Sequence, residues 1–305
     1  MLDKVPHISV MLNEVLKYLS PKDKDIILDA TFGAGGYTKA ILNSANCNVI
    51  GTDRDINVKQ FADQVSADYK GRFTFYNVKF SEVKTVIKEN SLDGIVLDLG
   101  VSSMQLDNAE RGFSFNKDAP LTMTMGRNDI TAYDVVNDYE EVNIANILYK
   151  YGEETNSRAI AKKIVQYRKN KKIETTCELA NIVRSCFPEH KYTKIDYATK
   201  TFQAIRIFVN NELIELETML KDSINLLKSG GRLVVVSFHS LEDRIVKDFF
   251  NENSDSKLGK INKYKEEQQK TIFKILTKKP VIVSDVEVDS NRRARSAKLR
   301  GVIKC

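Results

Sequence analysis

IILDATFGAGGYT, residues 26–38, decides the fold of this chain. Its first three residues are apolar and predict a buried strand, and a helical pattern resumes at its end. A strand, a glycine turn and a helix form the layout of a nucleotide-binding βα unit. Gly33, Gly35 and Gly36 lie in the turn, where the absence of Cβ atoms lets a ligand approach the backbone. Because the spacing is G-x-G-G and not G-x-G-x-x-G, a plain tight turn between strand and helix is the alternative.

Three apolar runs of the sequence each end in an acid, namely Asp29, Asp53 and Asp98. The carboxyl ends of parallel strands meet at one edge of a sheet, and open α/β sheets bind ligands there. Asp53 stands about 20 residues beyond the glycine turn, where an acid accepts hydrogen bonds from ribose hydroxyls. No Walker lysine follows the glycines, so the pattern favours an adenosine-containing cofactor over a triphosphate.

The composition predicts a packed globular protein. The 305 residues are 42% hydrophobic and 29% charged, and the net charge of +6 is compatible with a nucleic-acid partner. No apolar run approaches the ~20 residues that span a bilayer, and the N-terminus lacks the apolar region of a signal peptide. The four cysteines are scattered, so we expect reduced thiols in a cytoplasmic protein, with neither disulfides nor a metal site.

The order of elements predicts an α/β fold that contains an inserted helical domain. Strands are expected at 26–30, 48–53, 72–76 and 94–99, with helices between them at 37–44, 56–68 and 81–89. Such alternation is typical of a parallel sheet with right-handed crossovers. Only helical patterns occur over 131–189, so residues 104–195 are expected to form an inserted domain between 1–103 and 196–305.

The last third of the chain predicts the return of the sheet. One long helix is expected over 200–228 and a C-cap at Gly230 and Gly231. A strand is expected at 233–238 and a mobile loop over the polar residues 251–270. Strands at 271–276 and 298–303 are expected to pair antiparallel at the sheet edge.

Basic residues concentrate on the helix expected at 157–172. A charge run is usually a solvated helix face, but in a basic protein it also suits contact with phosphates. The RNA-binding candidates on this helix are Arg158, Lys162, Lys163 and Arg168. Arg111 and Arg206 are further candidates, for which phosphate binding and pairing with acids are equally compatible with the sequence.

Several blocks of sequence, in order along nearly the whole chain, carry a resemblance to a known family. They are HISVMLNE (7–14), DATFGAGG (29–36), DRD (53–55), LDLGVSS (97–103), QLD (105–107), AERGFSF (109–115), TFQAIR (201–206), SFHSLEDRI (237–245) and RARS (293–296). On these blocks the chain resembles the bacterial ribosomal RNA small subunit methyltransferase H family. The resemblance implies a class I methyltransferase with a Rossmann-like sheet, which uses S-adenosylmethionine and recognises its substrate through the inserted domain.

The resemblance also implies a reaction and a set of cofactor contacts. The reaction is N4-methylation of a cytidine in the decoding region of 16S ribosomal RNA, within a 30S subunit or an assembly intermediate. The sequence leaves the oligomeric state open, with a homodimer as one candidate. The cofactor contacts, transferred by motif position, are Gly35, Gly36, Tyr37, Asp53, Phe80, Asp98 and Gln105. Phe80 would pack on the adenine, although the residue alone equally fits an ordinary core aromatic.

The sequence departs from the family pattern at two places. Tyr37 stands where the family usually has histidine, and Thr122 and Thr124 replace an acid and an arginine. A function that needs those family side chains is therefore absent here or is supplied by other residues.

The proton acceptor for an N4 amine is left open by the sequence. Asp98, Ser102 and Ser103 follow a strand end, and His239 follows another, where it is more often structural. Two other classes of function remain compatible with the sequence: a non-catalytic RNA-binding assembly factor, and a methyltransferase that acts on DNA or on a small metabolite.

Overall fold

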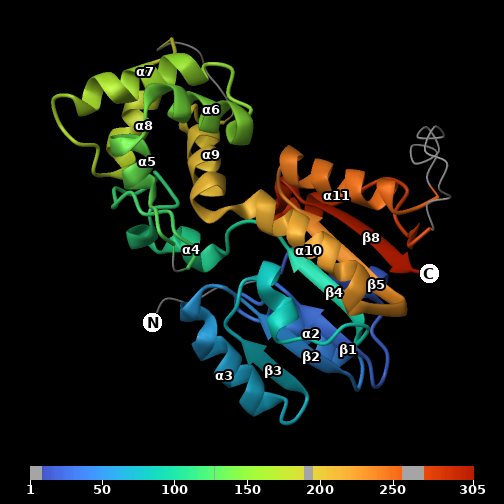
Figure 1. Cartoon of the computed structure of the whole chain (residues 1–305). Helices are drawn as coiled ribbons and strands as arrows, with labels where there is room; N and C mark the ends of the chain where they lie inside the picture. Colours follow the sequence, from blue (N-terminus) through green and yellow to red (C-terminus); the bar gives the residue numbers. More distant parts are fainter. Residues whose placement is uncertain (1–8, 127, 189–194, 256–270) are drawn as a thin grey trace. The chain divides into compact units, whose positions relative to one another are not determined.

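The computed structural model describes residues 9–126, 128–188, 195–255 and 271–305. The chain divides into two compact units. Residues 1–100 and 213–305 form an α/β unit, and residues 101–212 form a helical unit (Figure 1). Helix α9 (Ala198–Asn210) belongs to the helical unit, although the sequence led us to expect residues from 196 onward in the α/β part.

The α/β unit is built on an eight-stranded sheet in the order β3-β2-β1-β4-β5-β8-β6, with β7 paired to β8. The strands are β1 (Ile26–Asp29), β2 (Asn48–Thr52), β3 (Phe73–Tyr76), β4 (Leu92–Asp98), β5 (Leu227–Ser237), β6 (Phe273–Ile275), β7 (Val281–Ile282) and β8 (Lys298–Lys304). The first five strands pair in parallel, and β8 is antiparallel to β5, β6 and β7. The expected fold class, a mostly parallel sheet with an antiparallel edge, is confirmed.

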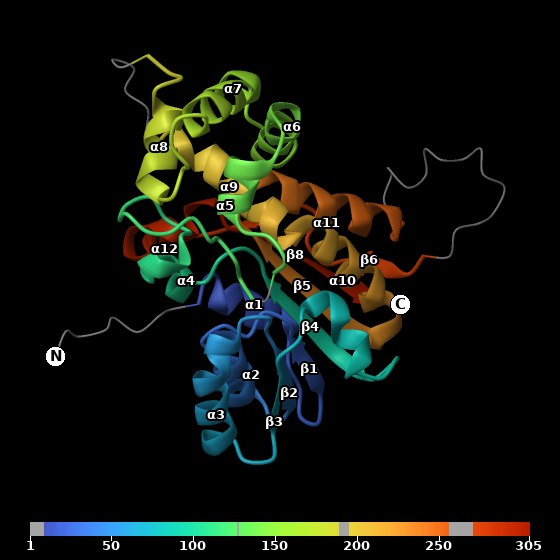
Figure 2. The ribbon, with the colours of Figure 1, turned by 60° about the vertical axis from the view of Figure 1, so that its left-hand side comes forward.

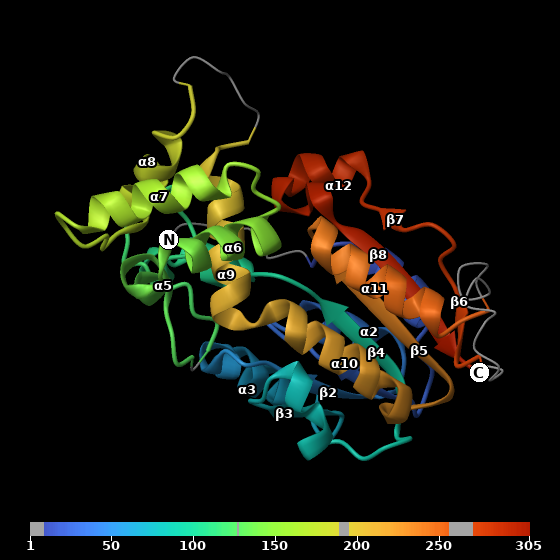
Figure 3. The ribbon, with the colours of Figure 1, turned by 45° about the horizontal axis from the view of Figure 1, so that its top comes forward.

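The sheet is buried because apolar residues cover both of its faces. The helices of this unit are α1 (Leu12–Leu19), α2 (Gly36–Ser44), α3 (Lys59–Asp68), α10 (Glu212–Leu226), α11 (Ser240–Glu252) and α12 (Asp285–Ser290). Leu28, Ile95 and Val235 of the central strands share one hydrophobic core with α10 and α11, which lie side by side along the sheet (Figure 3). Helices α2 and α3 lie beside β2 and β3 (Figure 2).

The strand order places a topological switch point between β1 and β4. From β1 the chain moves outward to β2 and β3, and then returns to β4 on the other side of β1. Open α/β sheets bind ligands beyond the carboxyl ends of their strands at such a switch point. Asp29 and Asp98 end the two strands and lie at this edge.

The structure corrects three sequence expectations in the α/β unit. The long helix expected over 200–228 is two helices, because Asn211 takes a left-handed conformation (φ 53°) between α9 and α10. Gly230 and Gly231 do not cap it: α10 ends at Leu226, and both glycines lie in β5, where its pairing with β4 is irregular. The helix expected at 81–89 is a short 3₁₀ segment, Phe80–Thr85. Residues 256–270 of the expected loop at 251–270 lie outside the described residues.

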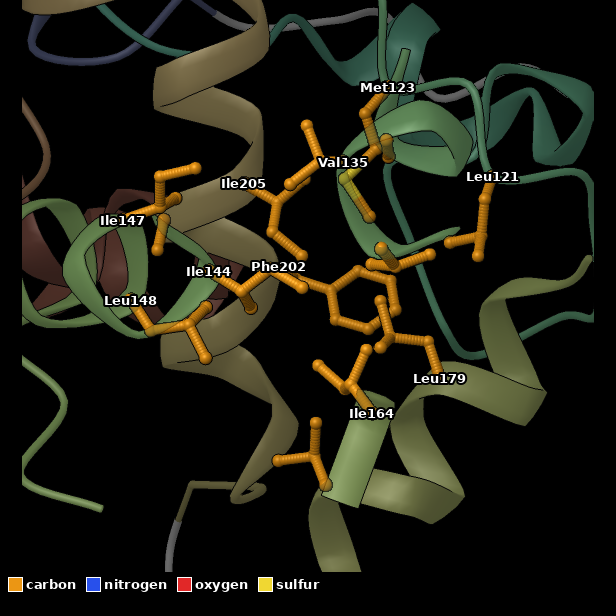
Figure 4. Packing of buried hydrophobic residues seen from close by; sticks show 14 of the residues in the cluster. Leu121, Met123, Val135, Ile144, Ile147, Leu148, Ile164, Leu179, Phe202 and Ile205 are labelled. Carbon is orange, nitrogen blue, oxygen red and sulfur yellow. The ribbon is translucent and has the colours of Figure 1, made fainter. Parts of the chain in front are cut away.

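The helical unit has the expected all-helical core. It contains α4 (Ser103–Asp107), α5 (Ala132–Asp138), α6 (Glu141–Gly152), α7 (Ser157–Arg168), α8 (Thr176–Arg184) and α9. Phe202 and Ile205 of α9 project into the centre of this core, where they meet Ile144 of α6 and Leu179 of α8 (Figure 4). Within the part of the chain that is described, none of the helices has the length and apolar character needed to cross a membrane.

Candidate functional site

Asp29 lies buried at the carboxyl end of β1, where it holds the first turn of α2. The hydroxyl of Thr38 donates to Asp29 Oδ2 at 2.7 Å, and the backbone N–H of Thr31 points at Oδ1 from 3.4 Å. Burial raises the pKa of Asp29 to about 6 in spite of these hydrogen bonds. Asp29 therefore acts mainly as a support for the glycine turn.

Asp53 follows β2, and its carboxylate is oriented by two backbone donors. Gly33 N–H donates to Oδ2 at 2.8 Å and Asp55 N–H donates to Oδ1 at 2.9 Å. Each oxygen keeps a further lone pair, which is what an acceptor for two ribose hydroxyls requires. Desolvation raises the pKa of Asp53 to about 6, so the group is mostly ionised at neutral pH. The arrangement fits the ribose role expected from the sequence.

The glycine turn is shaped by the protein's own side chains. Gly35 has φ 77°, which a residue with a Cβ rarely adopts, and an added Cβ would lie 2.9 Å from the Phe32 ring. A Cβ on Gly36 would lie 1.9 Å from Ser9 Oγ. We expected this space to admit a ligand, but Phe32 and Ser9 fill it. What the turn offers a ligand is the N-terminus of α2, whose N–H groups and dipole attract an anionic group.

Tyr37 is buried, and its ring does not face a ligand. The phenol donates a hydrogen bond to the backbone carbonyl of Val10. Burial, with smaller contributions from Asp98 and Asp29, holds the pKa of Tyr37 well above its ordinary value, so the phenol stays protonated. Only the backbone of Tyr37 remains a candidate for the cofactor contact that its motif position implies.

Asp98 ends β4 and presents an unsatisfied acceptor at the switch point. Its backbone N–H donates to Thr31 Oγ1 at 2.7 Å, which joins the ends of β4 and β1. Its Oδ1 atom is buried and has no hydrogen-bond partner among the described residues. Desolvation, followed by the charges of Asp29, Glu242 and Glu287, raises the pKa of Asp98 well above its ordinary value. A buried acceptor without a donor is costly, so this atom fits a donor that a ligand brings.

Phe80 begins the short 3₁₀ segment after β3 and is half-buried against the core of the α/β unit. This position keeps both expected roles open, because one part of the ring packs inward and another part stays accessible. Phe80 therefore remains a candidate for the adenine contact.

Gln105 and Ser102 belong to the helical unit and cap α4 together. The Ser102 backbone N–H donates to Gln105 Oε1 at 3.0 Å, and Gln105 N–H donates to Ser102 Oγ at 3.2 Å. This capping box occupies the serine oxygen as an acceptor but leaves its proton free for donation. Ser103 is the first residue of α4, and its side chain lies outside the described residues.

His239 is the N-cap of α11. Glu242 N–H donates to His239 Nδ1 at 3.5 Å, and Glu242 Oε2 in turn accepts the backbone N–H groups of Phe238 and His239. His239 Nε2 lies 3.0 Å from Glu242 Oε1. These contacts give His239 a structural function, in line with the more common role of a histidine at a strand end. A role as proton acceptor remains a hypothesis.

Comparison with known proteins identifies the family. The MraW methylase family matches residues 4–305. The chain is 53% identical over 302 residues to a ribosomal RNA small subunit methyltransferase H from Rickettsia bellii (strain RML369-C), covering 98% of this chain and 99% of that protein. It is 55% identical over 299 residues to the protein of the same name from Rickettsia massiliae (strain Mtu5), covering 96% of each. The chain belongs to the MraW methylase family.

Solved structures resemble the chain only distantly. TrmN from Thermus thermophilus aligns with 97% of this chain and 48% of its own chain, at 9% identity and a TM-score of 0.45. Membership of the MraW methylase family rests on the sequence matches alone, and it confirms the resemblance that the sequence blocks indicated. S-adenosylmethionine is the cofactor. The ionised Asp53 fits the ribose of this cofactor, and the N-terminus of α2 fits its carboxylate.

The basic candidates of this methylase fall into two groups. Three of them are tied to protein acceptors: Arg206 forms two 2.9 Å contacts with Glu212, Arg111 donates to the Thr124 carbonyl, and Arg168 donates to the carbonyls of Val136 and Tyr139. Arg158, Lys162 and Lys163 are exposed on α7. The second group offers its charges to solvent and is the better candidate for RNA phosphates.

Sequence reasoning missed several residues that shape the site. Thr31 and Thr38 both lie within residues 26–38. The Thr38 hydroxyl donates to the carboxylate of Asp29, and the Thr31 hydroxyl accepts the backbone N–H of Asp98. Their spacing from Asp29 is a signal that could have been used. Thr122 donates to the Arg111 carbonyl, so this replacement of a family acid serves local folding here. No local sequence pattern marks Ser9 or Glu287, because Ser9 lies beside Gly36 and Glu287 accepts from Met11, which are both distant in the sequence.

Proposed function

We propose that this methylase transfers a methyl group from S-adenosylmethionine to the N4 amine of a cytidine in small-subunit ribosomal RNA. The proposal is supported by relatives that are named ribosomal RNA small subunit methyltransferase H and match nearly the whole chain. The structural observation that carries it is Asp98 Oδ1, a buried acceptor without a partner among the described residues, at the switch point of the sheet.

The chemistry requires positioning and a proton acceptor. The cofactor supplies an activated methyl group, so the protein mainly needs to orient the reacting groups. The cytosine N4 amine is a weak nucleophile because its lone pair is delocalised into the ring. An acceptor for one N4–H localises this lone pair and takes up the proton that the transfer releases. Asp98 suits the task because its buried Oδ1 lies at the carboxyl end of β4 and has no hydrogen-bond partner among the described residues.

The target nucleotide is proposed to lie in the decoding region of the small subunit. A base inside a stacked helix cannot reach a site at the carboxyl edge of a sheet, so the cytidine must be unstacked first. Sequence-specific RNA recognition favours such splayed nucleotides. The exposed charges of Arg158, Lys162 and Lys163 would contact the surrounding phosphates. We therefore expect a 30S subunit or an assembly intermediate to be a better substrate than a short oligonucleotide.

The test measures transfer of tritium from labelled S-adenosylmethionine to small subunits that lack the modification. Digestion to nucleosides and mass spectrometry should place the label in N4-methylcytidine. Label in another nucleoside would contradict the proposed position. Cofactor binding without any transfer would favour a non-catalytic RNA-binding assembly factor. Transfer to DNA under the same conditions would favour a methyltransferase that acts on DNA.

Asp98→Asn separates the proton acceptor from the rest of the site. The variant keeps the shape of the side chain but loses the charge and the basicity. We expect transfer to fall by at least 100-fold, a typical contribution of general base catalysis. A variant that binds the cofactor and transfers methyl groups at the wild-type rate would move the assignment to Ser102 or His239.

A further inference from the structure

Residues 9–11, here called the N-terminal strap, lie across the start of α2. Ser9, Val10 and Met11 are all buried, and Met11 takes a left-handed conformation with φ 53°. A non-glycine residue adopts this conformation at an energetic cost, so surrounding contacts must hold it there. The strap is thus a fixed part of the α/β unit, although it lies near the end of the chain.

Two contacts from distant parts of the sequence fix the strap. The Tyr37 phenol donates to the carbonyl of Val10. The backbone N–H of Met11 donates to Glu287 Oε1 of α12 at 2.7 Å. Both contacts lie beside Ser9 in the chain, and together they set the position of its side chain.

Ser9 Oγ is aimed at the N-terminus of α2. It lies 1.9 Å from the position that a Cβ on Gly36, the first residue of this helix, would take. Ser9 is only 8% exposed, and no hydrogen bond involves its hydroxyl within the described parts of the chain. The hydroxyl proton can therefore be donated to a ligand that lies beside it. The position lies beside the first turn of a nine-residue helix, where Asp29 already accepts the N–H of Thr38 and where the helix dipole attracts a further anionic group.

We propose that Ser9 is a cofactor-binding residue whose hydroxyl donates a hydrogen bond to the methionine carboxylate of S-adenosylmethionine. The helix N-terminus attracts the carboxylate, and the hydroxyl supplies a donor directed at the same place. The strap contacts of Tyr37 and Glu287 make them positioning residues for Ser9. This inference rests on the cofactor named in the proposed function but not on the nucleotide that is methylated.

The test compares three ligands that share the adenosine part. S-adenosylmethionine and S-adenosylhomocysteine carry the carboxylate, whereas 5′-methylthioadenosine has a thioether and no amino-acid part. Dissociation constants are measured by calorimetry for the full chain and for Ser9→Ala. We expect the variant to bind the first two ligands about tenfold more weakly, as the loss of a hydrogen bond to a charged group predicts. Binding of 5′-methylthioadenosine should change less than about twofold, because it lacks the group that Ser9 contacts.

Ser9→Thr is the matched control, because it keeps the hydroxyl and should restore binding of both carboxylate ligands. An equal loss for all three ligands would mean that Ser9 only supports the fold, and no loss for any ligand would overturn the contact. If the wild-type chain bound no S-adenosylmethionine, both the contact and the proposed function would fall. Methylation of a different nucleotide would overturn the proposed function alone, because the binding measurement does not depend on it.

Discussion

Gly36 shows how a single missing side chain makes room for a neighbour at the site. A Cβ on this residue would overlap Ser9 Oγ and lie 3.2 Å from Ser9 Cβ. We expect Gly36→Ala to lower the free energy of unfolding by about 1–3 kcal/mol, as overpacking does in buried sites. The same change should be neutral or stabilising in a Ser9→Gly background, because Ala favours the helix and the overlap is gone.

A double-mutant cycle measured by chemical denaturation checks this prediction. The two single variants, the double variant and the wild-type chain give the coupling between the two positions. Equal destabilisation by Gly36→Ala in both backgrounds would show that the backbone at Gly36, and not Ser9, excludes a side chain.

The expected ribose contact of Asp53 predicts that cofactor affinity depends on pH. Its pKa of about 6 means that the carboxylate loses its charge as the pH falls through 6, and with the charge it loses an acceptor for the ribose hydroxyls. We expect the affinity for S-adenosylmethionine to be constant from pH 7 to 8 and to fall below about 6. In Asp53→Asn the affinity should be low throughout, and this inflection should be absent. Calorimetric titrations between pH 5 and 8 provide the measurement.

The effect of Asp53 on folding stability has the opposite sign. Its pKa is higher in the folded chain (about 6) than its ordinary value of 3.8, so the folded state binds more protons between these values. The contribution of Asp53 to stability is therefore largest at low pH and declines as the pH rises through this window. A loss of affinity below pH 6 that merely followed unfolding would contradict the ribose assignment.

At the scale of elements, Asn211 separates α9 from α10 by a left-handed residue. Asparagine adopts this conformation more readily than most residues, and glycine adopts it freely. We expect Asn211→Ala to lower the free energy of unfolding by about 1 kcal/mol and Asn211→Gly to leave it nearly unchanged. Thermal unfolding of the two variants is the measurement. Equal effects of Ala and Gly would show that the asparagine side chain, and not its backbone conformation, matters.

The elements that the sequence predicted correctly are those with a strong local pattern. The apolar runs that end in Asp29 and Asp98 are strands β1 and β4, because buried parallel strands need continuous apolar residues. The break at Asn211 was missed because the apolar helical spacing continues across it. The two-residue strand β7 and the short helix α12 have too few residues for any periodicity.

In the candidate site, too, the residues with a local sequence pattern could be predicted and the long-range contacts could not. Asp53 and Asp98 could be found because each ends an apolar run, and their places at the carboxyl edge follow from the fold. The contacts of Ser9 with the start of α2 and of Met11 with Glu287 could not be found, because they join residues that only the folded sheet brings together. The burial that raises the pKa of Asp98 is likewise a property of the packed structure.

At the scale of the whole molecule, the net charge of +6 says less about RNA binding than whether each lysine is exposed to solvent or paired with an acid. Lys162 and Lys163 are exposed on α7, whereas Lys171 and Lys172, a few residues further on, pair with Glu178 and Asp138. Both pairs contribute the same formal charge. Phosphate contacts need lysines whose charge is available, so the two pairs should differ in their effect on RNA binding.

The charge-reversal variants Lys162→Glu with Lys163→Glu, and Lys171→Glu with Lys172→Glu, test this difference at equal net charge. We expect the first to weaken binding to small subunits and to reduce the slope of log K against log salt by about 1.5, as the loss of two phosphate contacts predicts. The second should retain most of the wild-type slope, although its lost ion pairs lower stability slightly. Filter binding between 50 and 200 mM salt gives both slopes. If the two variants lost affinity equally, net charge alone would attract the RNA, and α7 would be an ordinary solvated face.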